Sequence, residues 1–177
     1  MPAPAASVLT ASQLTVAGLF AKRAATQPQA PALTDVHGTL TYQQLDGRVA
    51  RLAGALRASG LQRGDRVAIW SENRFEYIEL ELAAARLGLI VACLNWRLTD
   101  EEQRHCRQLV EPALLLVSPR YAAAQQRLAG LGDVTPQVIT LGSDFDAWRD
   151  AAAPLGEQDD VQAEDGLVIL YTSGTTG

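Results

Sequence analysis

Apolar positions in the first third of the chain recur with the spacing of an amphipathic helix. Between residues 41 and 60 they are separated by four, three and four positions, which places them on one helical face: Leu45, Val49, Leu52 and Leu56. Thr41 followed by Gln44 has the spacing of a capping box, and Gly60 supplies an end. The pattern therefore predicts a helix over this stretch, with its arginines (Arg48, Arg51 and Arg57) on a solvated face.

A second helix is expected after a short apolar run at residues 67–70. Asn73 is its expected N-cap, Glu76 follows three residues later, and Gly88 ends it. The residues expected to point inward are Phe75, Ile78, Leu82 and Ala85. The same succession of strand and helix then recurs along the chain.

Further short apolar runs predict strands at residues 89–94, 113–117, 138–141 and 167–171. Thr99 with Glu102 is expected to cap a helix that runs to about Leu109. Further helices are expected from Ser118–Pro119 onward and around Phe145 and Trp148. Residues 32–34 and 39–41 flank a glycine-containing turn, which predicts a hairpin, and a short helix is expected around residues 16–20. Strands that alternate with helices predict an α/β fold with a mostly parallel β-sheet covered by helices on both faces.

Composition and charge narrow the functional classes. The chain has 177 residues, of which 47% are hydrophobic, and this is enough for a sizeable core. Its formal net charge of -5 argues against a nucleic-acid-binding protein. The two cysteines, Cys93 and Cys106, lack metal-ligand spacing and are expected to be small, at least half-buried hydrophobes. Without a recognisable signal peptide or membrane span, the expected compartment is the cytoplasm.

The most informative segment is the last one, where the apolar run 167–171 is followed by four Ser/Thr hydroxyls and two glycines: Thr172, Ser173, Gly174, Thr175, Thr176 and Gly177. Glycines let several backbone N–H groups face one point, and hydroxyls add donors around it. In parallel sheets, ligands bind at the carboxyl ends of strands, which is where this loop falls. The segment therefore predicts a site for an anion, most plausibly a nucleotide phosphate.

Three segments together resemble the acyl-adenylate-forming (AMP-binding) superfamily. Residues 170–177 (LYTSGTTG) resemble its phosphate loop, which normally continues into a Pro-Lys-Gly stretch. Residues 40–45 (LTYQQL) resemble its first core motif, and residues 86–98 resemble its second. The ending LNWRL at residues 94–98 looks like the acyl-CoA synthetase branch. The resemblance spans roughly residues 15–177. It implies that residues 32–177 are the N-terminal portion of the large AMP-binding domain. Residues 1–31, with an amphipathic patch before Pro28 and Pro31, are expected to form an N-terminal helix and linker.

The resemblance implies a reaction in two steps. A carboxylate attacks ATP to give an acyl-adenylate and pyrophosphate, and the thiol of CoA then displaces AMP. It also implies that Thr172, Ser173, Thr175 and Thr176 contact the β- and γ-phosphates of ATP, while Gly174 and Gly177 allow close backbone approach. Arg97 is a candidate for a phosphate of CoA, although an exposed arginine with no ligand is an equally good interpretation, and Trp96 beside it could line the ligand channel or simply pack.

Members of the superfamily are several times longer, so the resemblance makes this chain an N-terminal piece. The expected partners are the remaining polypeptide of the same enzyme and, in a homodimer, a second copy. No catalytic residue or Mg²⁺ ligand is expected within the piece. The piece alone is therefore expected to be inactive. The acid that the enzyme activates stays unidentified.

Two other functional classes remain open from the residues alone. A P-loop nucleotide hydrolase would use Gly174 as the first glycine of its loop, with Gly-Lys-Ser or Gly-Lys-Thr beyond Gly177. A non-catalytic module that binds a nucleotide or a partner is the other. His37 and His105 have no nucleophile or orienting partner nearby in sequence, and the acidic residues at 159–165 are expected to form a solvated linker.

Overall fold

The computed structural model describes residues 14–36, 38–129 and 135–171. Its elements, in chain order, are α2 (Val16–Thr26), β1 (Pro31–Asp35), β2 (Gly38–Thr41), α3 (Tyr42–Ala58), β3 (Arg66–Trp70), α4 (Phe75–Leu87), β4 (Ile90–Leu94), α5 (Asp100–Val110), β5 (Leu114–Val117), the 3₁₀ turn η1 (Pro119–Tyr121), α6 (Ala122–Leu128), β6 (Gln137–Thr140), α7 (Ser143–Asp150) and β7 (Val168–Leu170). The expected alternation of strands and helices is confirmed.

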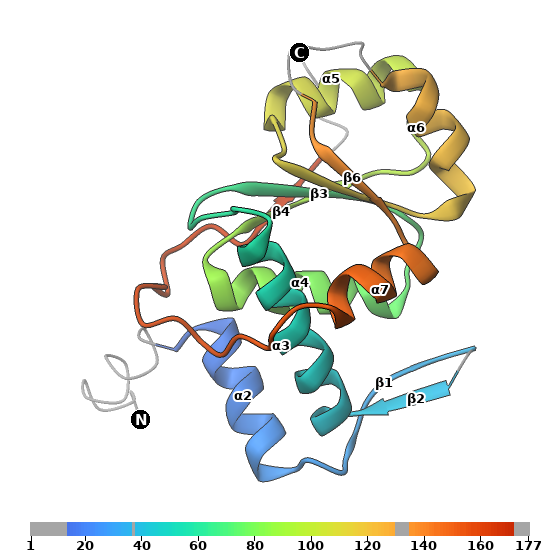
Figure 1. Cartoon of the computed structure of the whole chain (residues 1–177). Helices are drawn as coiled ribbons and strands as arrows, with labels where there is room; N and C mark the ends of the chain where they lie inside the picture. Colours follow the sequence, from blue (N-terminus) through green and yellow to red (C-terminus); the bar gives the residue numbers. More distant parts are fainter. Residues whose placement is uncertain (1–13, 37, 130–134, 172–177) are drawn as a thin grey trace, which may run out of the picture.

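Strands β3 to β7 form one five-stranded sheet in the order β6-β5-β3-β4-β7, and every neighbouring pair is parallel. The α/β fold with a parallel sheet is therefore confirmed. Because all strands run in one direction, their carboxyl ends meet at a single edge of the sheet, here called the carboxyl edge. Strands β1 and β2 form a separate antiparallel hairpin that extends away from the sheet (Figure 1).

Alternate residues of each strand feed two cores on opposite faces of the sheet. Val67 and Ile69 of β3 belong to the core shared with α3, α4 and α7, which α2 joins through Phe20. Ala68 and Trp70 belong to the core shared with α5 and α6. Helices thus cover both faces, with α5 and α6 on one side and α3, α4 and α7 on the other (Figure 1).

The starts of α3 and α5 are set by their first residues, as expected. Thr41 and Gln44 form a complete capping box, in which the Gln44 backbone N–H donates to Thr41 Oγ1 at 3.2 Å and the Thr41 N–H donates to Gln44 Oε1 at 2.9 Å. Thr99 and Glu102 form the second box. These are local interactions, so the sequence alone was sufficient to predict them.

Helix α4 departs from the prediction. Its N-cap is Arg74, which makes no side-chain cap bond, so Asn73 was the wrong choice. Of the four residues expected to point inward, only Ala85 is buried, while Leu80, Ala83, Ala84 and Leu87 are buried instead. Apolar residues surround much of this helix, which contacts α2, α3 and β4, so periodicity alone left its buried face undetermined.

The buried face of α4 includes a carboxylate, and this overturns the expectation for Arg48. Glu79 has no exposed surface, and Arg48 Nε donates to its Oε1 at 2.5 Å. Arg149 of α7, 3% exposed, donates from Nη1 to Glu79 Oε2 at 3.3 Å. Burial raises the pKa of Glu79, and the two guanidinium groups partly oppose that shift. Arg48 therefore belongs to an ion-pair network between α3, α4 and α7, not to a solvated face.

The chain after α7 crosses back over α3. The Leu155 N–H donates to Ala50 O at 2.8 Å, and Arg86 Nη1 donates to Leu155 O at 3.1 Å. A Cβ added to Gly54 would lie 1.9 Å from Ala153 O, so only glycine permits this approach. The crossing carries the chain to β7 and the carboxyl edge.

Candidate functional site

The carboxyl edge is where the predicted phosphate loop leaves the sheet. Residues 172–177 lie outside the described residues, which reach Tyr171 directly after β7. Tyr171 donates its hydroxyl to Cys106 O of α5 at 2.8 Å, and burial raises its pKa to about 12. Its phenol therefore stays protonated at neutral pH and ties the end of β7 to α5.

Strand β4 lies next to β7, and the loop that follows it carries Trp96 and Arg97. Asn95 Oδ1 accepts from the Arg97 backbone N–H at 3.0 Å, and Gln103, fully buried on α5, donates from Nε2 to Asn95 O at 2.7 Å. The capping box at Thr99 fixes the other end of the loop. The backbone that presents Arg97 is thus held at three points.

Strand β5 leaves the same edge through Ser118, which is 1% exposed. The Ser118 backbone N–H donates to Trp70 O at 3.0 Å, and its Oγ donates to Glu72 Oε1 at 3.1 Å. The same Oγ accepts from the Arg120 backbone N–H at 3.4 Å. Residues after β3 and β5 are therefore bonded together, and Arg120 and Tyr121 project from a fixed turn.

Three aromatic rings from these exits stack in a row. Trp70 and Tyr121 are nearly parallel, with centroids 5.3 Å apart and planes at 7°, and Trp96 lies 6.4 Å from Tyr121 at 25°. Guanidinium groups lie over them, and the set is here called the arginine–aromatic cluster: Trp70, Trp96 and Tyr121 with Arg97, Arg107 and Arg120. The rings and the guanidinium groups come from four segments that only the fold brings together.

Among the described residues, Arg97, Arg107 and Arg120 form no ion pair. Arg97 and Arg120 are exposed, whereas burial lowers the pKa of Arg107 to about 10, and its Nε and Nη2 lack hydrogen-bond partners. A positively charged area at the carboxyl edge of a chain with net charge -5 is suited to an anionic ligand.

Of the residues singled out from the sequence, Arg97 and Trp96 lie in this cluster. Arg120, Tyr121, Trp70 and Arg107 were missed. Three of these four end a strand or follow one closely, so the rule that ligands gather at the carboxyl ends of parallel strands could have found them. Arg107 lies in the last turn of α5, where its position gives no such signal.

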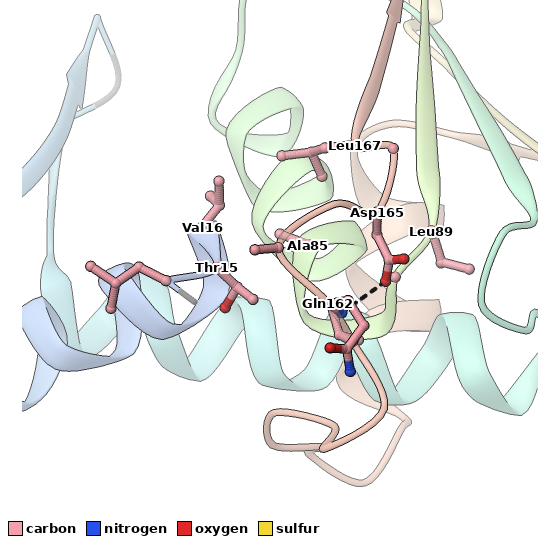
Figure 2. Close-up of a pocket in the computed structure, with 12 residues that line it drawn as sticks. Thr15, Val16, Ala85, Leu89, Gln162, Asp165 and Leu167 are labelled. Carbon is pink, nitrogen blue, oxygen red and sulfur yellow. Dashed lines mark hydrogen bonds between the residues drawn. The ribbon is translucent and has the colours of Figure 1, made fainter. Parts of the chain in front are cut away.

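A cavity at the opposite edge of the sheet is too small for a nucleotide. It has a volume of about 90 Å³ and lies between the start of α2, the end of α4 and residues 161–167, where Gln162 N–H donates to Asp165 (Figure 2). Ligand pockets usually measure about 300–1,000 Å³. Asp165 also accepts two hydrogen bonds from Arg63, so this acidic residue serves as a structural tie.

A larger hollow of about 460 Å³ lies between the hairpin and the loop after β3, with Arg48, Glu72, Arg74 and Glu76 among its lining residues. Arg74 pairs with Glu76 at 2.8 Å and Arg48 pairs with Glu79, so its arginines already have partners. It is less suited to an anion than the arginine–aromatic cluster.

The remaining candidates are two cysteines and two histidines. Cys106 is buried and Cys93 half-buried, as expected, and both thiols are free. His105 is exposed on α5, whereas His37 lies outside the described residues. No group of three or more His, Cys, Asp or Glu side chains suited to a metal ion occurs within the described ranges. Nor does any helix there have the length and apolar character needed to cross a membrane.

Comparison with known protein families shows to which family the chain belongs. The model of the AMP-binding enzyme family matches residues 20–177. The chain belongs to the AMP-binding enzyme family. Among curated relatives of this AMP-binding chain, the fatty acid–acyl-carrier-protein ligase ScoC of Streptomyces coeruleorubidus is 34% identical over 85% of the chain, and the indoleacetate–CoA ligase of Aromatoleum aromaticum is 35% identical over 88%.

Solved structures agree with the fold. The N-terminal domain of FACL13 from Mycobacterium tuberculosis superimposes on 90% of the AMP-binding chain with a TM-score of 0.84 at 25% identity, which covers 42% of that domain. ATP-bound MatB from Rhodopseudomonas palustris superimposes on 93% with a TM-score of 0.78 at 32% identity, which covers 33% of MatB. The AMP-binding chain spans 29% of the length of ScoC and 32% of that of the indoleacetate ligase.

Proposed function

We propose that this chain supplies the N-terminal portion of an ATP-dependent, AMP-forming acid–thiol ligase of the acyl-CoA synthetase type. The observation that carries the proposal is the family match over residues 20–177, which includes the glycine- and hydroxyl-rich segment after β7. The relatives named above are ligases that join an acid to CoA or to an acyl carrier protein. The match favours a ligase over a P-loop hydrolase or a non-catalytic module.

In this proposal, Thr172, Ser173, Thr175 and Thr176 donate hydrogen bonds to the β- and γ-phosphates of ATP, and Gly174 and Gly177 let the backbone approach. Pyrophosphate leaves more readily when fixed donors hold its negative charge. Tyr171 supports this role, because its bond to Cys106 O fixes the strand end from which the loop departs.

Arg97 is proposed to bind a phosphate of CoA. It is exposed, its backbone is fixed by Asn95, and its guanidinium lies 4.8 Å from the centre of the Trp96 ring. A guanidinium without a carboxylate partner fits a phosphate better than one already engaged in an ion pair. The ligands of Mg²⁺ are proposed to lie outside the described part of the chain.

Several finer features also belong to the proposal. Residues 1–31 would form a leading helix and linker, and residues 32–177 the first part of the AMP-binding domain. The rest of the polypeptide would complete the active site. The enzyme would act in the cytoplasm, and it could form a homodimer. Its acid substrate would be a small carboxylic acid of unassigned type.

The test is carboxylate-dependent exchange of radiolabelled pyrophosphate into ATP by the complete enzyme, followed by thioester formation with CoA. We expect both activities in the complete enzyme with at least one acid of a broad panel, and neither in the purified 177-residue chain. Exchange by the isolated chain would contradict the proposed division of labour. Absence of exchange in the complete enzyme over the whole panel would contradict the ligase assignment itself.

A further inference from the structure

Strand β7 is a short edge strand whose side chains select its register only weakly. It spans Val168–Leu170 and, in the described part of the chain, pairs with β4 alone. Val168 and Leu170 are 38% and 70% exposed. A strand usually fixes its register by burying apolar residues on one face, but every residue from 167 to 170 is a large aliphatic. Several registers would therefore bury similar side chains.

The register of β7 decides where the segment after it begins. Tyr171 follows β7 directly, and residues 172–177 come next. A slip by one residue against β4 would move Tyr171 by about 3.3 Å and turn its side chain to the other face of the sheet. Tyr171 could then no longer donate to Cys106 O, as it does at 2.8 Å. A contact outside the strand is needed to select the register.

A bidentate ion pair holds the chain just before β7. Arg63 donates from Nε to Asp165 Oδ2 at 2.8 Å and from Nη2 to Asp165 Oδ1 at 2.6 Å. The same Oδ2 accepts from the Gln162 N–H at 3.0 Å (Figure 2). The bonds from Arg63 lower the pKa of Asp165, so its carboxylate stays ionised at neutral pH. Two parallel bonds fix the direction of the carboxylate as well as its distance.

Arg63 is itself fixed relative to β4. It lies in the turn before β3, where Asp65 O accepts from the N–H of Ile90, the first residue of β4, at 2.9 Å. A Cβ added to Gly88 would lie 2.8 Å from Arg63 Cγ, so the stem of the arginine lies against the backbone that leads into β4. The ion pair therefore holds Asp165 in a set position relative to the strand that β7 pairs with.

We propose that Arg63 is a positioning residue which, through Asp165, sets the register of β7 and so the point from which segment 172–177 reaches ATP. The proposal rests on the proposed function, because that function assigns the segment to the phosphates of ATP. Two residues separate Asp165 from β7, and the second of them, Leu167, accepts from the Val91 N–H at 2.8 Å. Little slack therefore remains between the ion pair and the strand.

The first experiment measures carboxylate-dependent pyrophosphate exchange by the complete enzyme and its Arg63→Gln variant. We expect KM for ATP to rise about tenfold and KM for the acid to change by less than about twofold, because only the strand before the ATP-binding segment is displaced. A purely structural loss would reduce the amount of active enzyme and lower kcat, with KM for ATP unchanged. Arg63→Lys keeps the charge but not the bidentate bond, so its KM for ATP should be intermediate.

Arg127→Gln is the matched control. Arg127 makes a similar bidentate pair with Asp100, at 3.0 and 3.3 Å, but this pair joins α5 to α6. It should leave both KM values unchanged. Since both ion pairs are partly exposed, each variant should shift the midpoint of urea unfolding by less than about 0.5 M. An Arg63→Gln variant that cannot fold would show that the pair is required for folding, which contradicts a positioning role.

Hydrogen exchange in the complete enzyme tests the strand without any activity. The Val91 amide, which donates to Leu167 O, should exchange about tenfold faster in Arg63→Gln. The Ser118 amide, which donates to Trp70 O after β3, should exchange at an unchanged rate. Unchanged exchange at Val91 or an unchanged KM for ATP would contradict the proposal. Faster exchange at both amides would indicate general loosening and would contradict it as well.

The unmodified enzyme separates this proposal from the proposed function. If it shows no pyrophosphate exchange with any acid, the ligase assignment fails, while the Val91 amide still tests whether Arg63 holds β7. If it does exchange pyrophosphate and Arg63→Gln leaves KM for ATP unchanged, the positioning role alone fails.

Discussion

Arginines behave differently in two regions of the molecule, the helix layer of α3, α4 and α7 and the carboxyl edge of the sheet. On the side of α3, α4 and α7, the arginines Arg48, Arg86 and Arg149 each pair with a carboxylate. At the carboxyl edge, Arg97, Arg107 and Arg120 lie over aromatic rings and, among the described residues, have no acidic partner. The first set joins helices to one another. In the second set, no ion pair among the described residues neutralises the charge.

The contrast follows from the physics of burial. A guanidinium out of contact with water is strongly destabilised unless an anion accompanies it, so Arg149, at 3% exposed, needs Glu79. An exposed guanidinium is hydrated, so Arg97 and Arg120 can stay unpaired until an anionic ligand arrives. The location of unpaired charge therefore separates structural arginines from candidate functional ones.

The largest expected effect on stability comes from removing the carboxylate of Glu79, which pairs with arginines of α3 and α7. Glu79→Ala leaves Arg48 and Arg149 without their shared carboxylate, and should lower the free energy of unfolding by about 3–5 kcal/mol. Urea denaturation followed by circular dichroism measures it. Glu101→Ala, at an exposed position of α5, is the control and should stay within about 0.5 kcal/mol. A loss below about 1 kcal/mol for Glu79→Ala would show that the network contributes little.

The paired side can also be disturbed without touching a charge. Gly54→Ala places a methyl group against Ala153 O, and should destabilise the protein by about 1–3 kcal/mol despite the better helix propensity of alanine. Gly47→Ala on the same helix meets only the flexible end of Arg51, so it should be neutral or stabilising by up to about 1 kcal/mol. Thermal unfolding of the two variants side by side tests the difference, and equal effects would contradict the close approach at Gly54.

A smaller effect is expected at the carboxyl edge from Tyr171→Phe, which removes one hydrogen bond to α5. The expected loss is about 0.5–1.5 kcal/mol in denaturant unfolding. In the complete enzyme the same change should raise KM for ATP in pyrophosphate exchange, because the strand end before the phosphate loop loses an anchor. Unchanged stability and unchanged KM together would show that this bond does not position the loop.

Among the ion-paired residues of α3, α4 and α7, Glu76 should make the free energy of unfolding depend on pH. Burial is the largest single influence on its pKa and would raise it. The hydrogen bonds from Arg74 and from a backbone N–H, together with the charges of Arg74 and Arg48, outweigh burial and leave the pKa of Glu76 below its usual value. A lowered pKa in the folded state adds stability above the unfolded pKa, and that stability is lost as pH falls through the folded value. Glu76→Gln should therefore flatten the fall in stability on the acid side of pH 4.5. Urea denaturation at a series of pH values measures this. If the variant and the unmodified protein lose stability equally below pH 4.5, the pKa of Glu76 is not lowered in the folded state.

The smallest expected effect sharpens the comparison most. Arg120→Ala should change the free energy of unfolding by less than about 0.5 kcal/mol, because no carboxylate loses its partner. Arg149→Ala, the same substitution on the paired side, should cost about 3–5 kcal/mol. Similar losses for both would remove the distinction between structural and ligand-directed arginines.

Much of the fold could be predicted from the sequence because its signals are local. The two capping boxes at Thr41 and Thr99 depend on residues three positions apart, and the strand–helix alternation depends on short apolar runs. Helix α4 failed because its apolar residues offer more than one possible buried face, and contacts with α2, α3 and β4 select one. No local signal marks Glu79 as the partner of Arg48 and Arg149, which lie 31 and 70 residues away.

Some residues of the candidate site could likewise be predicted from the sequence, and others could not. Arg97 and the segment 172–177 were found because they lie in recognisable motifs. Arg120 belongs to no motif, and its significance depends on a ring 24 residues earlier, at Trp96, that reaches the same point of the sheet edge through a different strand.

The sequence by itself determined the family, the parallel α/β architecture and the helix starts, since each depends on residues close together along the chain. Only the tertiary structure decided which arginines are neutralised and which are not. Whether a charge has a partner depends on distance in space and on exposure to water, and both are set when the strands and helices pack together.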